Sequence, residues 1–101
     1  MTPRLFVRRP ARADIADDFK WYESRSAGLG HEFLRVIRVA FASITRSPEQ
    51  YPVAIDDIRR CTLRRFPFVI YYRWEPAREQ ITVYAIMHCS REPGYWHHRE
   101  E

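Results

Sequence analysis

The residues best suited to chemistry lie near the carboxyl end of the chain, where His88 is followed by Arg91 and then by Tyr95. Cleavage of RNA through its own 2′-hydroxyl needs a base, a proton donor and a cation for the phosphorane. Histidine changes its charge near neutral pH, arginine holds phosphate, and tyrosine donates a proton or stacks on a base. A structural explanation is also open: His88 ends a strand, Arg91 pairs with a neighbour and Tyr95 packs on the core. The residue types alone favour that structural explanation.

A second candidate is the stretch from Arg59 to Arg73, which contains no acidic residue in a chain of net charge +4. Its arginines are Arg59, Arg60, Arg64, Arg65 and Arg73. Guanidinium groups bind phosphate and carboxylate in bidentate fashion, so this stretch predicts an acidic partner, either nucleic acid or protein. A GC-rich genome accounts for much of the wider arginine bias, and a solvated strand edge is the structural alternative.

The spacing of the histidines, cysteines and glycines gives little indication of a metal or cofactor site. His97 and His98 are adjacent and point apart, and no carboxylate or cysteine lies at ligand spacing from them. Cys89 beside His88 fails as a nucleophile–base pair for the same geometric reason. There are three glycines and no glycine-rich phosphate loop. We therefore expect neither a metal nor a cofactor.

The amino-terminal half predicts a strand and a helical hairpin. The apolar run 5–7 is an opening strand. Apolar residues then recur at helical spacing over 11–22 and again over 33–44, with a glycine break at 28–30. Pro10 suits the first turn of the first helix. Three carboxylates of that helix are expected to be solvated partners of the helix dipole: Asp14, Asp17 and Asp18.

The carboxyl-terminal half predicts three strands, at 60–64, 68–74 and 81–88. Alternation in the first places Arg60 and Arg64 opposite the apolar residues, on the sheet face that the helices leave open. Alternation in the last divides two sets of side chains: Ile81, Val83, Ala85 and Met87 on one face, and Thr82, Tyr84, Ile86 and His88 on the other. His88 is therefore expected beside the open-face arginines.

These elements predict one α+β domain over residues 1–101, in the order β-α-α-β-β-β, with the hairpin on one face of a mostly antiparallel sheet. The core between hairpin and sheet is expected to include Phe33, Ile37, Ile70 and Val83. The longest apolar run is too short to span a membrane, and the apolar segment near the amino terminus is too short for a secretory signal. Cys61 and Cys89 fit reduced thiols. We therefore expect a cytoplasmic protein that does not contact membranes.

Several segments in this order resemble the RelE/ParE toxins, also called plasmid stabilisation proteins. They are Trp21-Tyr22-Glu23, Gly28-Leu29-Gly30, Phe33-Leu34, Ser47 to Pro52, Arg59-Arg60, Arg65 to Arg73, and the closing pattern of His88, Arg91, Pro93, Trp96 and Arg99. The resemblance covers almost the whole chain. It implies the β-α-α-β-β-β fold and a growth-inhibiting toxin of a type II toxin–antitoxin system. Its partner would be a cognate antitoxin of the ParD or RelB kind with an acidic segment, in a toxin–antitoxin hetero-oligomer.

The resemblance leaves the target open. Some members poison DNA gyrase and have no catalytic set, whereas others are ribosome-dependent mRNA endonucleases, or mRNA interferases. The closing pattern is more typical of the ParE-like branch, and arginine cannot replace a catalytic lysine as a base. We therefore favour a non-enzymatic gyrase inhibitor over an endonuclease, and over a degenerate, non-toxic binding module.

Each alternative assigns its own residues. An endonuclease would use His88, Arg91, Tyr95 and Arg64. Binding of antitoxin or target would use Arg60, Arg64, Arg65, Arg73, Trp21 and Trp96.

Overall fold

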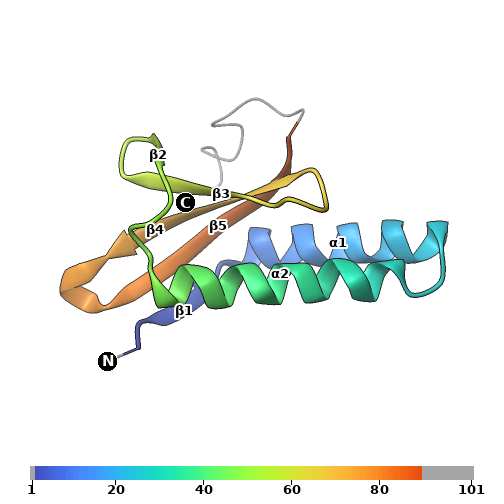
Figure 1. Cartoon of the computed structure of the whole chain (residues 1–101), viewed down its shortest axis with the longest axis horizontal. Coiled ribbons are helices and arrows are strands. Elements are labelled where there is room, and N and C mark those ends of the chain that lie inside the picture. The colour runs from blue at the N-terminus through green and yellow to red at the C-terminus, as the bar shows by residue number, and fades with distance from the viewer. Residues whose placement is uncertain (1, 90–101) are drawn as a thin grey trace.

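The computed structural model describes residues 2–89 (Figure 1). The elements are β1 (Arg4–Val7), α1 (Arg9–Arg25), α2 (Leu29–Arg46), β2 (Val53–Ile55), β3 (Ile58–Thr62), β4 (Phe68–Glu75), a 3-10 turn η1 (Pro76–Arg78) and β5 (Gln80–His88). The predicted β-α-α-β-β-β order is confirmed, with one further short strand, β2, ahead of β3. Within residues 2–89, no helix is both long and apolar enough to cross a membrane.

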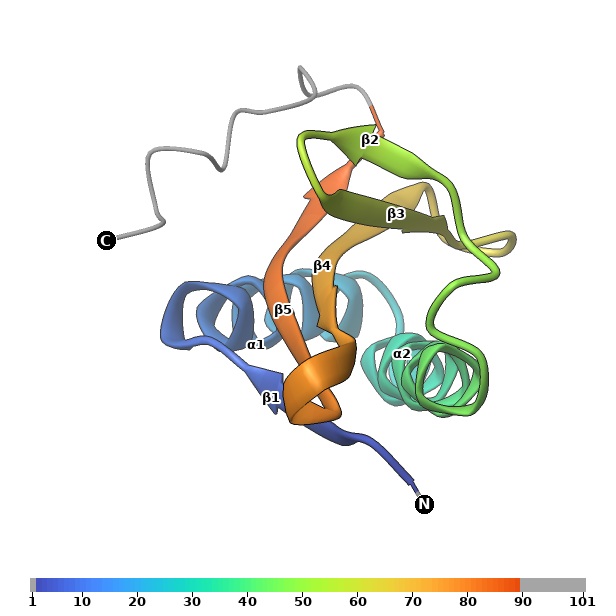
Figure 2. The same cartoon turned by 90° about the vertical axis from the view of Figure 1, so that its left-hand side faces the viewer.

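The five strands form one sheet in the order β1-β5-β4-β3-β2. β1 pairs with β5 in parallel, and every other neighbouring pair is antiparallel. The two helices lie side by side along one face of this sheet, as Figures 1 and 2 show together. We call that face the hairpin face and the opposite one the open face.

The core lies between the hairpin and the sheet. Phe33 and Ile37 of α2 are 0% and 3% exposed, and Ile70 and Val83 of the central strands are both fully buried. All four belong to one apolar cluster, so the predicted core is confirmed. The apolar stripe of α2 thus lies against the sheet because its spacing follows the helical period.

The turn between the helices is built on glycine and one carboxylate. Gly28 adopts φ of 89°, a left-handed conformation that favours glycine. A Cβ on Gly30 would lie 2.7 Å from the carbonyl oxygen of Phe19, so the two helices approach too closely there for a side chain. The Glu23 carboxylate accepts the N–H groups of Gly28 and Gly30, at 2.8 and 2.9 Å. These bonds lower the pKa of Glu23, the Gly28 bond contributing most.

Strand β5 departs from strict alternation at a bulge. Tyr72 of β4 pairs with Val83, but Tyr71 pairs with Ala85, so Tyr84 is an extra residue. Side chains beyond the bulge exchange faces: Ile86 joins the hairpin-face cluster, while Ala85 joins the cluster on the open face. The predicted alternation of this strand is therefore wrong beyond Tyr84, because one inserted residue inverts a period of two.

The open face carries a second apolar cluster. Its members are Ile58, Val69, Tyr71, Tyr84, Ala85 and Met87, each at most 8% exposed. The central strand β4 therefore contributes apolar side chains to both faces, as its nearly continuous apolar sequence predicts.

Candidate functional site

The five arginines of the basic stretch do not form one surface. Arg59 donates to the carbonyl oxygens of Glu49 and Tyr51, the latter at 2.7 Å. Arg65 lies in the turn between β3 and β4 and pairs with Glu32 of α2 at 2.6 Å. Arg73 pairs with Asp57 at 3.1 Å. These three guanidinium groups are engaged in the fold.

Arg60 and Arg64 are different. Both are exposed, and neither forms a hydrogen bond or ion pair through its side chain within residues 2–89. Arg60 pairs across the strands with Tyr71, a member of the open-face cluster, as the alternation of β3 predicts. Burial raises the pKa of Tyr71, although nearby Arg60 acts to lower it. Burial of Tyr71 therefore favours the neutral phenol.

Two further arginines meet at one open-face aromatic ring. Arg8 and Arg73 lie 5.3 and 5.4 Å from the centroid of the Tyr84 ring. Arg73 also donates to the Tyr84 hydroxyl at 2.9 Å. These contacts hold the bulge residue Tyr84 between one cation that follows β1 and another on β4, the two strands that flank β5.

His88 is not beside Arg60. The bulge turns its side chain to the hairpin face, where its ring contacts Phe68 edge-to-face at 5.4 Å. Phe68 belongs to the hairpin-face cluster. The expected placement of His88 on the open face is therefore wrong, and the structure separates the histidine from the open-face arginine. Asp14, expected to be solvated, instead accepts the N–H of Ile86 just past the bulge, at 3.1 Å.

His88 lies instead at one end of an aromatic network. Phe68 contacts Tyr22 of α1 at 6.2 Å, and Tyr22 contacts Phe66 of the β3–β4 turn at 4.9 Å. Tyr22 also contacts Trp21 at 5.1 Å. Trp21 is 53% exposed, so this network connects the buried core with the surface.

The remaining predicted site residues, Arg91, Tyr95 and Trp96, lie outside the described residues. Cys61 is a buried free thiol and Cys89 an exposed one. Within residues 2–89, no three histidine, cysteine, aspartate or glutamate side chains converge as a metal site would require.

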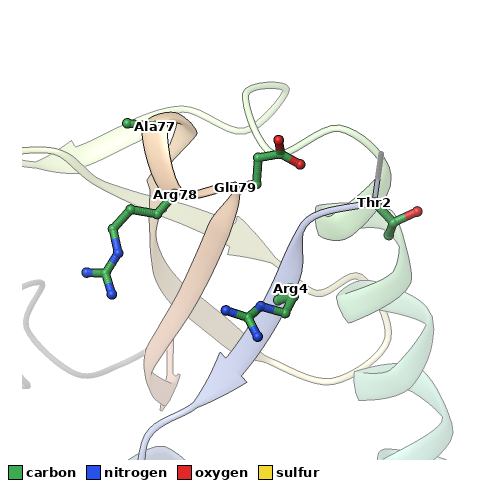
Figure 3. Close-up of a pocket in the computed structure, with 5 residues that line it drawn as sticks. All are labelled: Thr2, Arg4, Ala77, Arg78 and Glu79. Atoms are coloured by element: carbon green, nitrogen blue, oxygen red, sulfur yellow. The ribbon is translucent and has the colours of Figure 1, made fainter.

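A shallow cavity lies at the opposite end of β5 from His88, with a volume of about 400 Å³. Its lining residues are Thr2, Arg4, Ala77, Arg78 and Glu79. In Figure 3 their side chains point in different directions and do not converge on one point. Arg78 also approaches Glu75, at 3.9 Å. This arrangement does not build a site for a small ligand.

Sequence reasoning missed two residues that shape these surfaces, Arg25 and Glu32. Arg25 stacks on Trp21 at 4.6 Å, and the interval of four on a helix could have indicated this pair. Glu32 bridges Arg35 and Arg65. Its contact with Arg65 joins residues far apart in sequence, so no local signal could have shown it.

Comparison with known proteins supports the same fold. The chain matches the family model for the ParE toxin of the type II toxin–antitoxin system parDE over residues 5–93. No curated protein sequence matches significantly.

Three solved structures share the architecture at low identity. A chain of the chromosomal ParDE toxin–antitoxin system from P. aeruginosa is 21% identical with a TM-score of 0.72, and the alignment covers 86% of this chain and 96% of that one. A chain of the RelBE2 toxin–antitoxin complex from Mycobacterium tuberculosis is 14% identical with a TM-score of 0.60, covering 87% and 99%. The isolated E. coli RelE toxin is 13% identical with a TM-score of 0.58, covering 97% and 96%. Since the family model spans most of its length, the chain belongs to the family of ParE toxins of type II toxin–antitoxin systems.

Proposed function

We propose that this chain inhibits growth by poisoning DNA gyrase in the cytoplasm, without catalysis of its own, and that a cognate antitoxin neutralises it in a hetero-oligomer. The proposal assigns Arg60 and the open face of the sheet to contact with the target. Membership of the ParE family supports this reading.

The match to the ParE family model is the observation that carries the proposal, and the placement of His88 away from the open face adds to it. An endonuclease needs a base within hydrogen-bonding reach of the proton it removes and a cation at the phosphate. His88 contacts Phe68 on the hairpin face, whereas Arg60 is next to Tyr71 on the open face. The open face therefore carries the Arg60 cation without His88 beside it, which suits a surface that acts by contact alone.

A supercoiling assay with purified gyrase tests the proposal. The full chain should inhibit supercoiling and accumulate cleaved DNA, and induction in cells should start a DNA-damage response. Arg60→Glu should weaken inhibition, while Arg38→Glu, an equal charge reversal on the exposed side of α2, should not. Unimpeded supercoiling at a large excess of toxin would refute the gyrase assignment.

The endonuclease alternative makes a different prediction at His88. On that alternative, His88→Gln abolishes mRNA cleavage at the ribosome, since glutamine keeps size and polarity but cannot act as a base. On our proposal, toxicity tolerates His88→Gln and primer extension finds no new mRNA ends after induction. Cells that grow normally during induction of the wild-type chain would instead support a non-toxic binding module.

A further inference from the structure

The surface around Trp21 has a composition distinct from that of the open face. Trp21 and Arg25 lie on α1, Arg64 and Arg65 lie in the turn between β3 and β4, and His88 ends β5. We call these five residues the aromatic edge. Ring contacts bring the three segments together, since Tyr22 of α1 contacts Phe66 of the β3–β4 turn and Phe68 contacts His88 at the end of β5.

Ring contacts hold the aromatic edge in place from beneath. Tyr22 contacts both Trp21 and Phe66, at 5.1 and 4.9 Å. Phe66 is 5% exposed and contacts Phe33 at 5.4 Å, so the support is part of the core. The exposed ring of Trp21 is therefore presented by a rigid layer, and its side chain loses little freedom when a partner binds.

The charge of the aromatic edge is positive and only partly neutralised. Arg65 pairs with Glu32, which also pairs with Arg35. Arg25 and Arg64 are exposed and have no carboxylate partner within residues 2–89. The edge therefore combines an exposed apolar ring with cations available to carboxylates, which suits an acidic partner.

The ring geometry favours a peptide over single-stranded nucleic acid. Stacking of bases needs flat, exposed ring faces in succession. Here Arg25 covers one face of Trp21 at 4.6 Å, and the rings behind it meet edge-to-face and are shielded. An apolar side chain can pack on the remaining Trp21 surface while neighbouring carboxylates reach Arg25 and Arg64.

We propose that the aromatic edge binds an acidic peptide segment that carries at least one large apolar side chain. This inference rests on the proposed function, under which the segment belongs to the antitoxin. The open face around Arg60 then remains a separate surface for the target. The basic stretch from Arg59 to Arg73 thus serves two partners through different arginines.

Binding of the full chain to the antitoxin encoded beside its gene tests the inference, by calorimetry at low and moderate salt. Trp21→Ala should weaken the complex about 30-fold, as for a buried aromatic anchor of an interface. Arg25→Glu and Arg64→Glu should each weaken it about tenfold, more at low salt, because exposed charges are screened. Arg60→Glu should change the affinity by less than about threefold, in the range of energetically neutral positions.

The chain offers a matched control at the other end of the molecule. Phe6 is 46% exposed and carries Arg4 over its ring at 5.5 Å, the same arrangement as Trp21 with Arg25. Phe6→Ala should leave the antitoxin affinity within about threefold of wild type. A melting curve of each variant separates loss of contact from loss of fold.

The outcomes distinguish this inference from the proposed function. Failure of the wild-type chain to bind the antitoxin overturns both. Binding that Trp21→Ala and Arg64→Glu leave unchanged in folded protein overturns the aromatic edge alone, as does a greater loss from Arg60→Glu than from Arg25→Glu. Tight, salt-dependent binding of single-stranded oligothymidylate that Trp21→Ala abolishes would replace the peptide with nucleic acid.

Discussion

The two faces of the sheet are both lined by apolar side chains, but they differ in what holds them. On the hairpin face, residues of two helices and four strands interlock around Phe33 and Ile70. On the open face, the cluster around Tyr71 contains residues of β3, β4 and β5 alone and borders several arginines. The hairpin face therefore carries the tertiary packing between helices and sheet, while the open face also presents Arg60, whose side chain forms no ion pair within residues 2–89.

That difference indicates that substitutions on the open face can change binding without destabilising the fold. The Arg60 side chain forms no hydrogen bond or ion pair within the described part of the chain, so substitutions there should alter binding and leave the free energy of unfolding nearly unchanged. Substitutions on the hairpin face should do the reverse.

The largest effect is expected at Phe33, which is fully buried against Phe66 and Phe68. Phe33→Ala should lower the free energy of unfolding by about 3–5 kcal/mol, because it removes a ring and leaves a cavity. Urea denaturation measures the loss. Val39→Ala on the same helix is the control: Val39 is 65% exposed, and its truncation should cost less than about 0.5 kcal/mol. Similar losses from both variants would mean that α2 packs through another face.

A smaller loss is expected where the two helices approach. Gly30→Ala places a methyl group 2.7 Å from the Phe19 carbonyl oxygen, and backbone cannot move aside as a flexible side chain can. We expect a loss of about 2–3 kcal/mol, above the roughly 1 kcal/mol that alanine gains over glycine within a helix. Gly28→Ala meets no atom within 4 Å but adopts φ of +89°. It should cost about 1–2 kcal/mol through backbone strain alone. A stabilised Gly30→Ala variant would show that the helices can separate at little cost.

The contact between Asp14 and β5 should contribute less again. Asp14→Ala leaves the N–H of Ile86 without its acceptor, which should cost about 1–2 kcal/mol. Asp14→Asn retains an acceptor oxygen and should recover most of that loss. Hydrogen exchange gives a local measurement, since the Ile86 amide should exchange faster in Asp14→Ala and near the wild-type rate in Asp14→Asn. Equal exchange rates of the Ile86 amide in all three proteins would mean that the Asp14 carboxylate does not protect this part of β5.

The hairpin and its core could be predicted from sequence because they follow local rules. The helical period identified Phe33 and Ile37, and the glycines marked the turn between the helices. The bulge at Tyr84 could not be predicted, since it depends on pairing with β4 and on the hydrogen bond from Ile86 to Asp14.

The same limit applied to the candidate site. The five arginines look equivalent in sequence, and only tertiary contacts show that Arg65 and Arg73 form ion pairs while Arg60 forms none within residues 2–89. His88 was expected beside Arg60 because strict alternation was extended through a strand that contains an inserted residue. The face on which a residue lies at the end of a long strand can therefore be predicted only when the pairing of every earlier residue in that strand is known.

The smallest effect is a dependence of stability on pH through Glu23. Hydrogen bonds from Gly28 and Gly30 lower its folded-state pKa below the ordinary value of 4.5. A lowered carboxyl pKa contributes stability above the unfolded-state value and loses it as pH falls through the folded-state value. The melting temperature should therefore fall on acidification below about pH 4.5, and should fall less in Glu23→Gln, which has no proton to gain. Asp17→Asn is the control, since Asp17 lies exposed on the same helix and forms no side-chain hydrogen bond within residues 2–89. The dependence on Glu23 would be refuted if Glu23→Gln lost stability at the same pH as wild type while Asp17→Asn lost it at a different pH. The turn between the helices would then not depend on the Glu23 carboxylate.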